Sequence, residues 1–265
     1  MSKRIAIIGG GNLGVSIAEG LLLSGYKKPE EITVTKRNTV VLEPLQRKGV
    51  LIESDNLKAV KDADIILICV KPYQVKEVLE QLAPSINSSH ILVSVVTGVT
   101  IEQLNEFAGG GKTIFRAMPN TAIAIQQSMT CISHSNASET QAELVHELFS
   151  KLGKVVTIEE KLMDAATVLG ACGTAYAMRY IRANIQGGIE IGFDAATARL
   201  IAAQTVRGAA EMLLVNNTHP ESEIDKVTTP QGCTIAGLNE MEHRGFSSSL
   251  IRGLTASFKK IKGMI

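Results

Sequence analysis

The 265-residue chain is 45% hydrophobic and 20% charged, which is typical of a globular protein and excludes intrinsic disorder. Its formal net charge of +1 provides no field that favours nucleic acid or a membrane surface as a partner. The first apolar run is too short for a secretory signal, and no stretch reaches the roughly 20 apolar residues of a membrane span, so we expect a soluble cytoplasmic protein.

The early part of the chain alternates short apolar runs with amphipathic segments. Strands are predicted at residues 4–8, 32–35, 64–70, 91–96, 113–117, 129–133 and 155–158. Helices are predicted at residues 13–23, 73–82, 101–107 and 139–152. Ser138 and Gln141 stand at capping-box spacing before the last helix, and Gly153 follows it. This alternation predicts an α/β fold of βαβ units with a mostly parallel sheet.

Beyond residue 160 no convincing strand pattern remains, and long alanine-rich segments take over. These segments predict helices at residues 163–191, 195–215, 234–243 and 247–261. We therefore divide the chain into an α/β domain at residues 1–160 and an all-helical domain at 161–265. Residues 200–214 are apolar over most of the helix circumference, which indicates burial on several sides. A compact monomeric bundle is one solution, and interlocking with a second copy of the chain is the one we expect.

A glycine-rich turn follows the first predicted strand. Gly9, Gly11 and Gly14 form the pattern Gly-x-Gly-x-x-Gly between that strand and a helix, with Asn12 and Leu13 inside it. The glycines permit a tight turn, close backbone approach to a pyrophosphate, and close packing of helix on strand. All five residues are therefore candidates to bind a dinucleotide at the helix N-terminus. The alternative is a glycine-rich turn without a ligand.

The end of the second predicted strand carries no acidic residue. NAD-specific sites usually place a carboxylate there, but this chain has Thr35, Lys36 and Arg37, a hydroxyl followed by two cations. These groups suit the 2′-phosphate of NADP(H), which a carboxylate would repel. We expect NADP(H), with NAD(H) as the second choice. In the alternative interpretation Lys36 and Arg37 are a solvated surface pair.

Two proline-containing loops, at residues 70–73 and 116–121, follow predicted strands. The carboxyl ends of strands line the ligand crevice in open α/β sheets, so Lys71, Asn120 and Thr121 are candidates to face a nicotinamide or a substrate. They could instead simply end their strands. Near the C-terminus, residues 226–234 form a loop of small and hydroxyl-bearing residues before a new helix. The free N–H groups at that helix start suit a small anion.

The four cysteines are scattered and form no ligand cluster with the five histidines, so neither a metal site nor a disulfide framework is expected. Their positions are Cys69, Cys131, Cys172 and Cys233. The sequence also offers no paired carboxylates, no Cys–His dyad and no nucleophile elbow. We interpret Cys172 and Cys233 as packing residues and not as nucleophiles.

The combination of motifs resembles the Δ1-pyrroline-5-carboxylate reductase family from end to end. The matching segments are IAIIGGGNLG (5–14), CVKP (69–72), VVTGVTIEQL (95–104), FRAMPNTA (115–122), AAQTVRGAAEML (202–213) and VTTPQGCTIAGLNEME (227–242). Two segments depart from the family pattern. Residues 170–176 read GACGTAY where the family commonly has SGSGPAY, and residues 228–234 read TTPQGCT where TSPGGTT is usual.

The resemblance implies a Rossmann-type N-terminal domain and a helical C-terminal domain that forms a homodimer or a higher homo-oligomer. It implies an oxidoreductase of proline biosynthesis that reduces a cyclic imine carboxylate to proline with NAD(P)H. Each active site would join the cofactor domain of one subunit to the helices of a dimer. The implied cofactor contacts include Asn56, Val70, Lys71 and Pro72. The implied substrate contacts are Gly232, Cys233, Thr234, Asn120 and Glu160.

Reduction of such an imine requires hydride delivery, a proton at nitrogen and a hold on the carboxylate. We expect the N–H groups of Gly232, Cys233 and Thr234 to hold the carboxylate and the Thr234 hydroxyl to relay the proton, which makes Thr234 the predicted catalytic residue. Alternatively, Thr234 is only the N-cap of a helix at residues 235–242. Two other functions stay open: a paralogue that reduces another imine or keto acid, and a dinucleotide-binding scaffold without catalysis.

Overall fold

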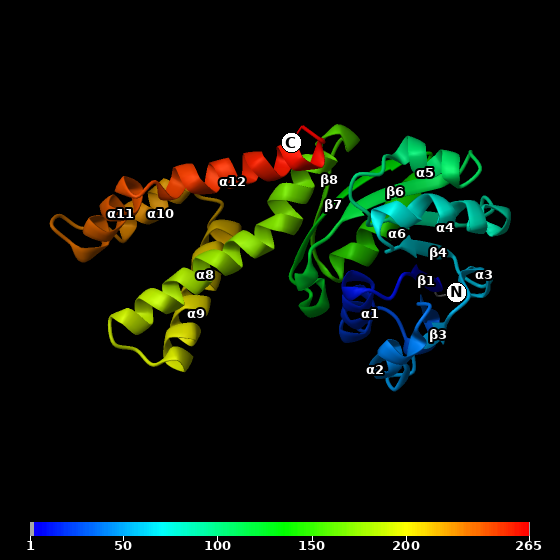
Figure 1. Ribbon diagram of the computed structural model, residues 1–265, viewed down its shortest axis with the longest axis horizontal. Coiled ribbons are helices and arrows are strands. Elements are labelled where there is room, and N and C mark those ends of the chain that lie inside the picture. Colours follow the sequence, from blue (N-terminus) through cyan, green and yellow to red (C-terminus); the bar gives the residue numbers. More distant parts are fainter. Residues whose placement is uncertain (1–2, 265) are drawn as a thin grey trace. The chain divides into compact units, whose positions relative to one another are not determined.

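The structure is a computed structural model that describes residues 3–264 (Figure 1). The chain forms two compact units, which divide between Cys172 and Gly173. The division lies later than the predicted boundary at residue 160, because helix α7 (Met163–Ala166) and the following π-helical turn η7 (Thr167–Cys172) pack against strands of the first unit.

The first unit is built on an eight-stranded sheet of order β3-β2-β1-β4-β5-β6-β7-β8. Its strands are β1 (Ile5–Ile8), β2 (Ile32–Thr35), β3 (Leu51–Glu53), β4 (Ile65–Ile68), β5 (Ile91–Ser94), β6 (Thr113–Met118), β7 (Ser128–Ser135) and β8 (Gly153–Thr157). All neighbouring pairs are parallel except β6 and β7, which confirms the predicted mostly parallel sheet. Strand β3, with only three residues, was not predicted.

Helices cover both faces of this sheet, and their apolar stripes form two cores. On one face α1 (Asn12–Leu23) and α6 (Glu139–Ser150) pack over the sheet, with Ile17 and Phe149 fully buried. On the other face lie α3 (Asn56–Val60), α4 (Val75–Leu82) and α5 (Ile101–Phe107). The central strands β1, β4 and β5 are buried along their whole length, as expected for parallel strands between two helical layers.

Local sequence signals set most helix limits in the first unit. The capping box of Ser138 and Gln141 is present at the start of α6, as predicted. A second capping box, of Thr100 and Gln103, begins α5. The short helix α2 (Glu43–Gln46) follows a 3₁₀ turn, η2 (Thr39–Leu42), and completes the cover of β2 and β3.

The second unit is entirely helical within the described residues. Its helices are α8 (Gly173–Glu190), α9 (Ala195–Asn216), α10 (Pro220–Lys226), α11 (Cys233–His243) and α12 (Phe246–Ile261). The segment predicted as one helix at residues 163–191 is helical from Met163 to Glu190, and the π-helical turn η7 lies between α7 and α8. Helix α10 was not predicted. None of the helices in residues 3–264 has the length and apolar character needed to cross a membrane.

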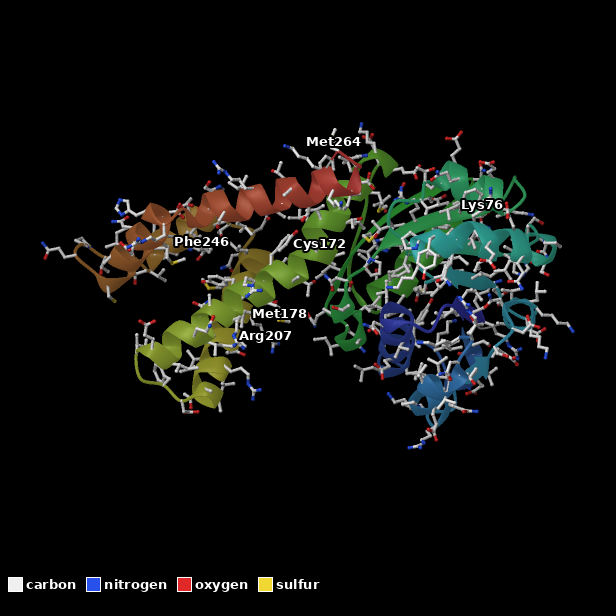
Figure 2. All side chains as sticks on the ribbon, in the orientation of Figure 1. Lys76, Cys172, Met178, Arg207, Phe246 and Met264 are labelled. Atoms are coloured by element: carbon white, nitrogen blue, oxygen red, sulfur yellow. The ribbon has the colours of Figure 1, made fainter. Side chains whose placement is uncertain are left out.

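The helices of the second unit pack in pairs, α8 with α9 and α11 with α12, and bury little apolar surface. Only Ala198 and Ala202 are buried hydrophobic residues among its described positions. Met178, which projects from α8 in Figure 2, is 61% exposed, and Leu200 on α9 is 70% exposed. The apolar residues of the helix at 200–214, which the sequence indicates to be buried, are therefore largely exposed to solvent in the single chain.

Candidate functional site

The glycine turn after β1 is as tight as its sequence predicts. Gly9 has a φ of +112°, and a Cβ at this position would lie 2.8 Å from the backbone of Cys69 at the end of β4. A Cβ at Gly14 would clash with the carbonyl oxygen of Gly9. Nothing lies within 4 Å of a Cβ built on Gly11, so this side of the turn faces open space. The turn therefore leaves room for a ligand beside the start of α1.

The N-terminus of α1 is uncapped by any side chain. Gly11 is the N-cap residue, and the first helical backbone bond runs from the Val15 N–H to the Gly11 carbonyl. The N–H groups of Asn12, Leu13 and Gly14 consequently have no partner within the helix. Their dipoles and the partial positive charge of the helix end favour an anion at this place.

The end of β2 is bonded directly to the glycine turn. Thr35 is 2% exposed; its hydroxyl accepts from the Gly9 N–H at 3.3 Å, and its carbonyl accepts from the Gly10 N–H at 2.6 Å. The Lys36 ammonium donates to the Gly10 carbonyl at 2.8 Å. Arg37 is exposed and has no side-chain partner among residues 3–264. Of the three residues predicted to bind a 2′-phosphate, only Arg37 therefore has a side chain without a hydrogen bond or ion pair in the described structure.

The other predicted cofactor residues lie at the same edge of the sheet, after the carboxyl ends of β3 and β4. Asn56 begins α3, whose N-cap Asp55 accepts from the Leu57 N–H. Val70 is half-buried, and Lys71 and Pro72 are exposed at the start of the turn that leads into α4. Their role as cofactor contacts stays a prediction that agrees with their place in the sheet.

Asn120 lies beyond the end of β6, and both ends of its side chain are engaged. Its Oδ1 accepts from the Ala122 N–H at 3.0 Å, and its Nδ2 donates to the Gly170 carbonyl in η7 at 3.2 Å. Asn120 therefore ties the edge of the sheet to the last turn before the second unit. One N–H of Nδ2 and one lone pair of Oδ1 are left over, so the predicted substrate contact stays a prediction.

Glu160 takes part in a buried ion pair that the sequence did not reveal. Its Oε1 accepts from Arg116 Nη1 at 2.9 Å and from the Ile101 N–H, the first amide of α5, at 2.6 Å. Arg116, in the middle of β6, is only 4% exposed, and its Nε has no partner in the described structure. The only signal for this pair was the presence of a charged residue inside an otherwise apolar strand.

A cleft of about 500 Å³ opens beside this ion pair, with Glu160 in its wall. Residues of α5, β6, β7 and β8 line it, and Lys112 places it at the amino-terminal end of β6. The glycine turn instead lies at the carboxyl ends of β1 and β4. The cleft is therefore separate from the place predicted for the dinucleotide.

The loop before α11 leads into a helix start that no side chain caps. Gly232 is the N-cap of α11 and provides no side-chain cap, so the N–H groups of Cys233, Thr234 and Ile235 lack helical partners. The Gly232 N–H, which was predicted to hold the carboxylate with those of Cys233 and Thr234, instead donates to the Thr229 carbonyl at 2.9 Å. The interpretation of Thr234 as the N-cap is wrong, since the helix begins one residue earlier, at Cys233. Both Cys233 and Thr234 are exposed, and no side-chain bond engages the Thr234 hydroxyl within residues 3–264. This helix start can receive a carboxylate.

Comparison with known proteins identifies the family. A model described as "Pyrroline-5-carboxylate reductase dimerisation" matches residues 160–264, and one described as "NADP oxidoreductase coenzyme F420-dependent" matches residues 4–98. Pyrroline-5-carboxylate reductase 2 of Dictyostelium discoideum is 44% identical over 98% of this chain and 92% of its own length. The chain belongs to the pyrroline-5-carboxylate reductase family. Pyrroline-5-carboxylate reductase 1 of the same organism is 47% identical over 97% of this chain, which spans 49% of that relative.

Solved structures of reductases in this family share the fold. Plasmodium falciparum pyrroline carboxylate reductase with NADP bound is 27% identical, with a TM-score of 0.89 and coverage of 99% of this chain and 98% of its own. The Coxiella burnetii pyrroline-5-carboxylate reductase is 29% identical, with the same TM-score and coverage. The two-faced, largely parallel sheet and the helical second unit are thus the fold of these reductases.

Proposed function

We propose that this protein reduces 1-pyrroline-5-carboxylate to proline with NADPH. The family assignment supports the reaction, and the observation that carries it is the pair of uncapped helix starts, one at a glycine turn and one at the signature loop of α11. The first suits a dinucleotide pyrophosphate and the second a small carboxylate. A hydride transfer needs no other charged catalytic group if the imine binds protonated.

The residues after β1 and β2 would hold the coenzyme. The N–H groups of Asn12, Leu13 and Gly14 would bind the pyrophosphate, and Arg37 would pair with the 2′-phosphate. Asn56 would approach the adenosine ribose, and the segment from Val70 to Pro72 the nicotinamide half. When bound, the reduced nicotinamide supplies the hydride. The NADP-containing relative supports this choice, and NAD(H) is the second coenzyme to test.

The start of α11 would hold the substrate. The N–H groups of Cys233, Thr234 and Ile235 would bind its carboxylate, at the positive end of the helix dipole. The exposed Thr234 hydroxyl would donate a hydrogen bond to the ring nitrogen and relay a proton to the nitrogen of the product amine. Asn120 and Glu160 would add further contacts to the substrate, although both side chains also bind groups of the protein.

We propose that the working form is a homodimer made by the second unit, with higher oligomers built from it. Large hydrophobic side chains of α8, α9 and α12 stay exposed in the single chain; Leu200, Leu214 and Ile251 are each more than 60% exposed. A second copy of this unit would bury them, at roughly 25 cal/mol per Å² of apolar area. The dimerisation model matched by this segment supports the proposal. A cytoplasmic location is proposed from composition alone.

The decisive experiment follows NADPH absorbance with purified protein and 1-pyrroline-5-carboxylate, with NADH in parallel. We expect rapid NADPH oxidation and slower oxidation of NADH. The six-membered homologue of the imine is the matched comparison, because preference for it would identify a paralogue with another substrate. Binding of NADPH without oxidation by any cyclic imine would instead identify a non-catalytic scaffold and contradict the proposal.

A further inference from the structure

The bond between Lys36 and the glycine turn separates the two cations that follow β2. Lys36 is half-buried, and its ammonium is 2.8 Å from the Gly10 carbonyl oxygen. Arg37, the next residue, is exposed and has no described partner. Residues that look equivalent in the sequence therefore stand in different electrostatic environments.

The peptide between Gly10 and Gly11 is fixed at both ends. Its oxygen, on Gly10, accepts from Lys36, and its N–H, on Gly11, donates to the Gly9 carbonyl at 2.9 Å. The peptide before it is also held, because the Gly10 N–H donates to the Thr35 carbonyl at 2.6 Å. With Gly9 and Gly10 both bonded to the end of β2, the direction in which the chain enters α1 is set.

An unpaired carbonyl in this turn would work against an anionic ligand. The Gly10 oxygen precedes the N-cap of α1, within the same turn that must present N–H groups to a pyrophosphate. A Lys36 ammonium on that oxygen neutralises its partial negative charge and restrains the turn. The ammonium keeps two further N–H groups, so only the relative loss of NADPH and NADH affinity separates positioning of the turn from direct binding of a 2′-phosphate.

We propose, resting on the proposed function, that Lys36 is a positioning residue for the glycine turn and that Arg37 alone distinguishes NADPH from NADH. Loss of the Lys36 side chain should then lower the affinity for NADPH and for NADH to the same extent, since both coenzymes carry the pyrophosphate. Loss of Arg37 should weaken only ligands that carry the 2′-phosphate. The ratio of the two affinities is the property that separates positioning from direct phosphate binding.

The test measures dissociation constants of NADPH and NADH for the full chain by fluorescence, so that it needs no turnover. For Lys36→Met we expect the affinity for each coenzyme to fall about tenfold, or about 1.4 kcal/mol, while the ratio of the two affinities stays unchanged. Arg37→Ala should lower the NADPH-to-NADH affinity ratio at least about tenfold. The fragment 2′,5′-ADP should follow NADPH in the Arg37 variant. Lys48→Met, which removes a surface cation paired with Glu19, is the control for net charge.

Selective loss of NADPH binding in Lys36→Met, or no loss for either coenzyme, would overturn the proposal. Lys36→Gln keeps a hydrogen-bond donor without the charge, and it should restore part of the affinity for both coenzymes. This variant also carries the test if Lys36→Met does not fold. If the unmodified protein binds neither coenzyme, the proposed function itself fails, which is distinct from a failure confined to the variants.

Discussion

Removal of Glu160 tests whether the buried ion pair is structural or part of the substrate site. Arg116 is 4% exposed, so its guanidinium cannot regain water when its partner is lost. Breaking a buried pair in this way costs about 3–5 kcal/mol. Because the Glu160 side chain is 34% exposed, we expect the lower end of that range, about 3 kcal/mol, for Glu160→Ala. At about 2–4 °C per kcal/mol, Tm should fall by roughly 6–12 °C.

The assay is thermal unfolding at a fixed protein concentration, since subunit association also shifts Tm. Glu160→Gln keeps an acceptor for the Ile101 N–H and should lose less stability than Glu160→Ala. The double variant Arg116→Met/Glu160→Leu removes both charges and should regain stability relative to Glu160→Ala. An unchanged Tm for Glu160→Ala together with a large rise in the KM for the imine would refute the structural role and leave Glu160 with its proposed substrate contact alone.

Three further predictions concern the hydroxyl, a buried thiol and the apolar helices. Thr234→Ala should lower turnover at least about tenfold at unchanged NADPH affinity, whereas Thr234→Ser should keep most of it; normal turnover of the Ala variant would contradict the proton relay. Burial raises the pKa of the Cys69 thiol from its ordinary value of 9.0 to about 12. The thiol of the unfolded chain loses its proton at a lower pH than that of the folded chain, so the free energy of unfolding should fall as the pH rises from 9.0 to about 12. An equally steep fall of the unfolding free energy with pH in the unmodified protein and in Cys69→Ala would exclude the thiol as its cause. Leu200→Glu should convert the dimer to monomers in sedimentation experiments, while Leu200→Met, which keeps an apolar side chain at the same place, should stay dimeric; a dimeric Leu200→Glu variant would require a different interface.

Periodicity and capping signals predicted most elements because they act locally. The run of apolar residues at β4 and the capping box before α6 needed no tertiary information. Strand β3 was missed because three residues beside a parallel neighbour give no readable alternation. Helix α10 carried a signal that could have been used, since Pro220 stands at its first position with acidic residues behind it.

Tertiary contacts decided what the sequence could not predict. The π-helical turn between α7 and α8 occurs where the Asn120 side chain donates to the Gly170 carbonyl, a contact over 50 residues that does not follow from local sequence. In the same way Lys36 and Arg37 are adjacent cations of equal charge, and only the path of the chain assigns one of them to the glycine turn. The residue types of the site were predictable from the sequence, but which of the two cations bonds to the protein and which is exposed was not.

The most direct measurement is a crystal structure of the protein with NADP and proline. We expect the proline carboxylate about 3 Å from the N–H groups that begin α11, at residues 233–235, with the ring nitrogen near the Thr234 hydroxyl. A carboxylate held by charged side chains, or a proline bound away from this helix start, would contradict it.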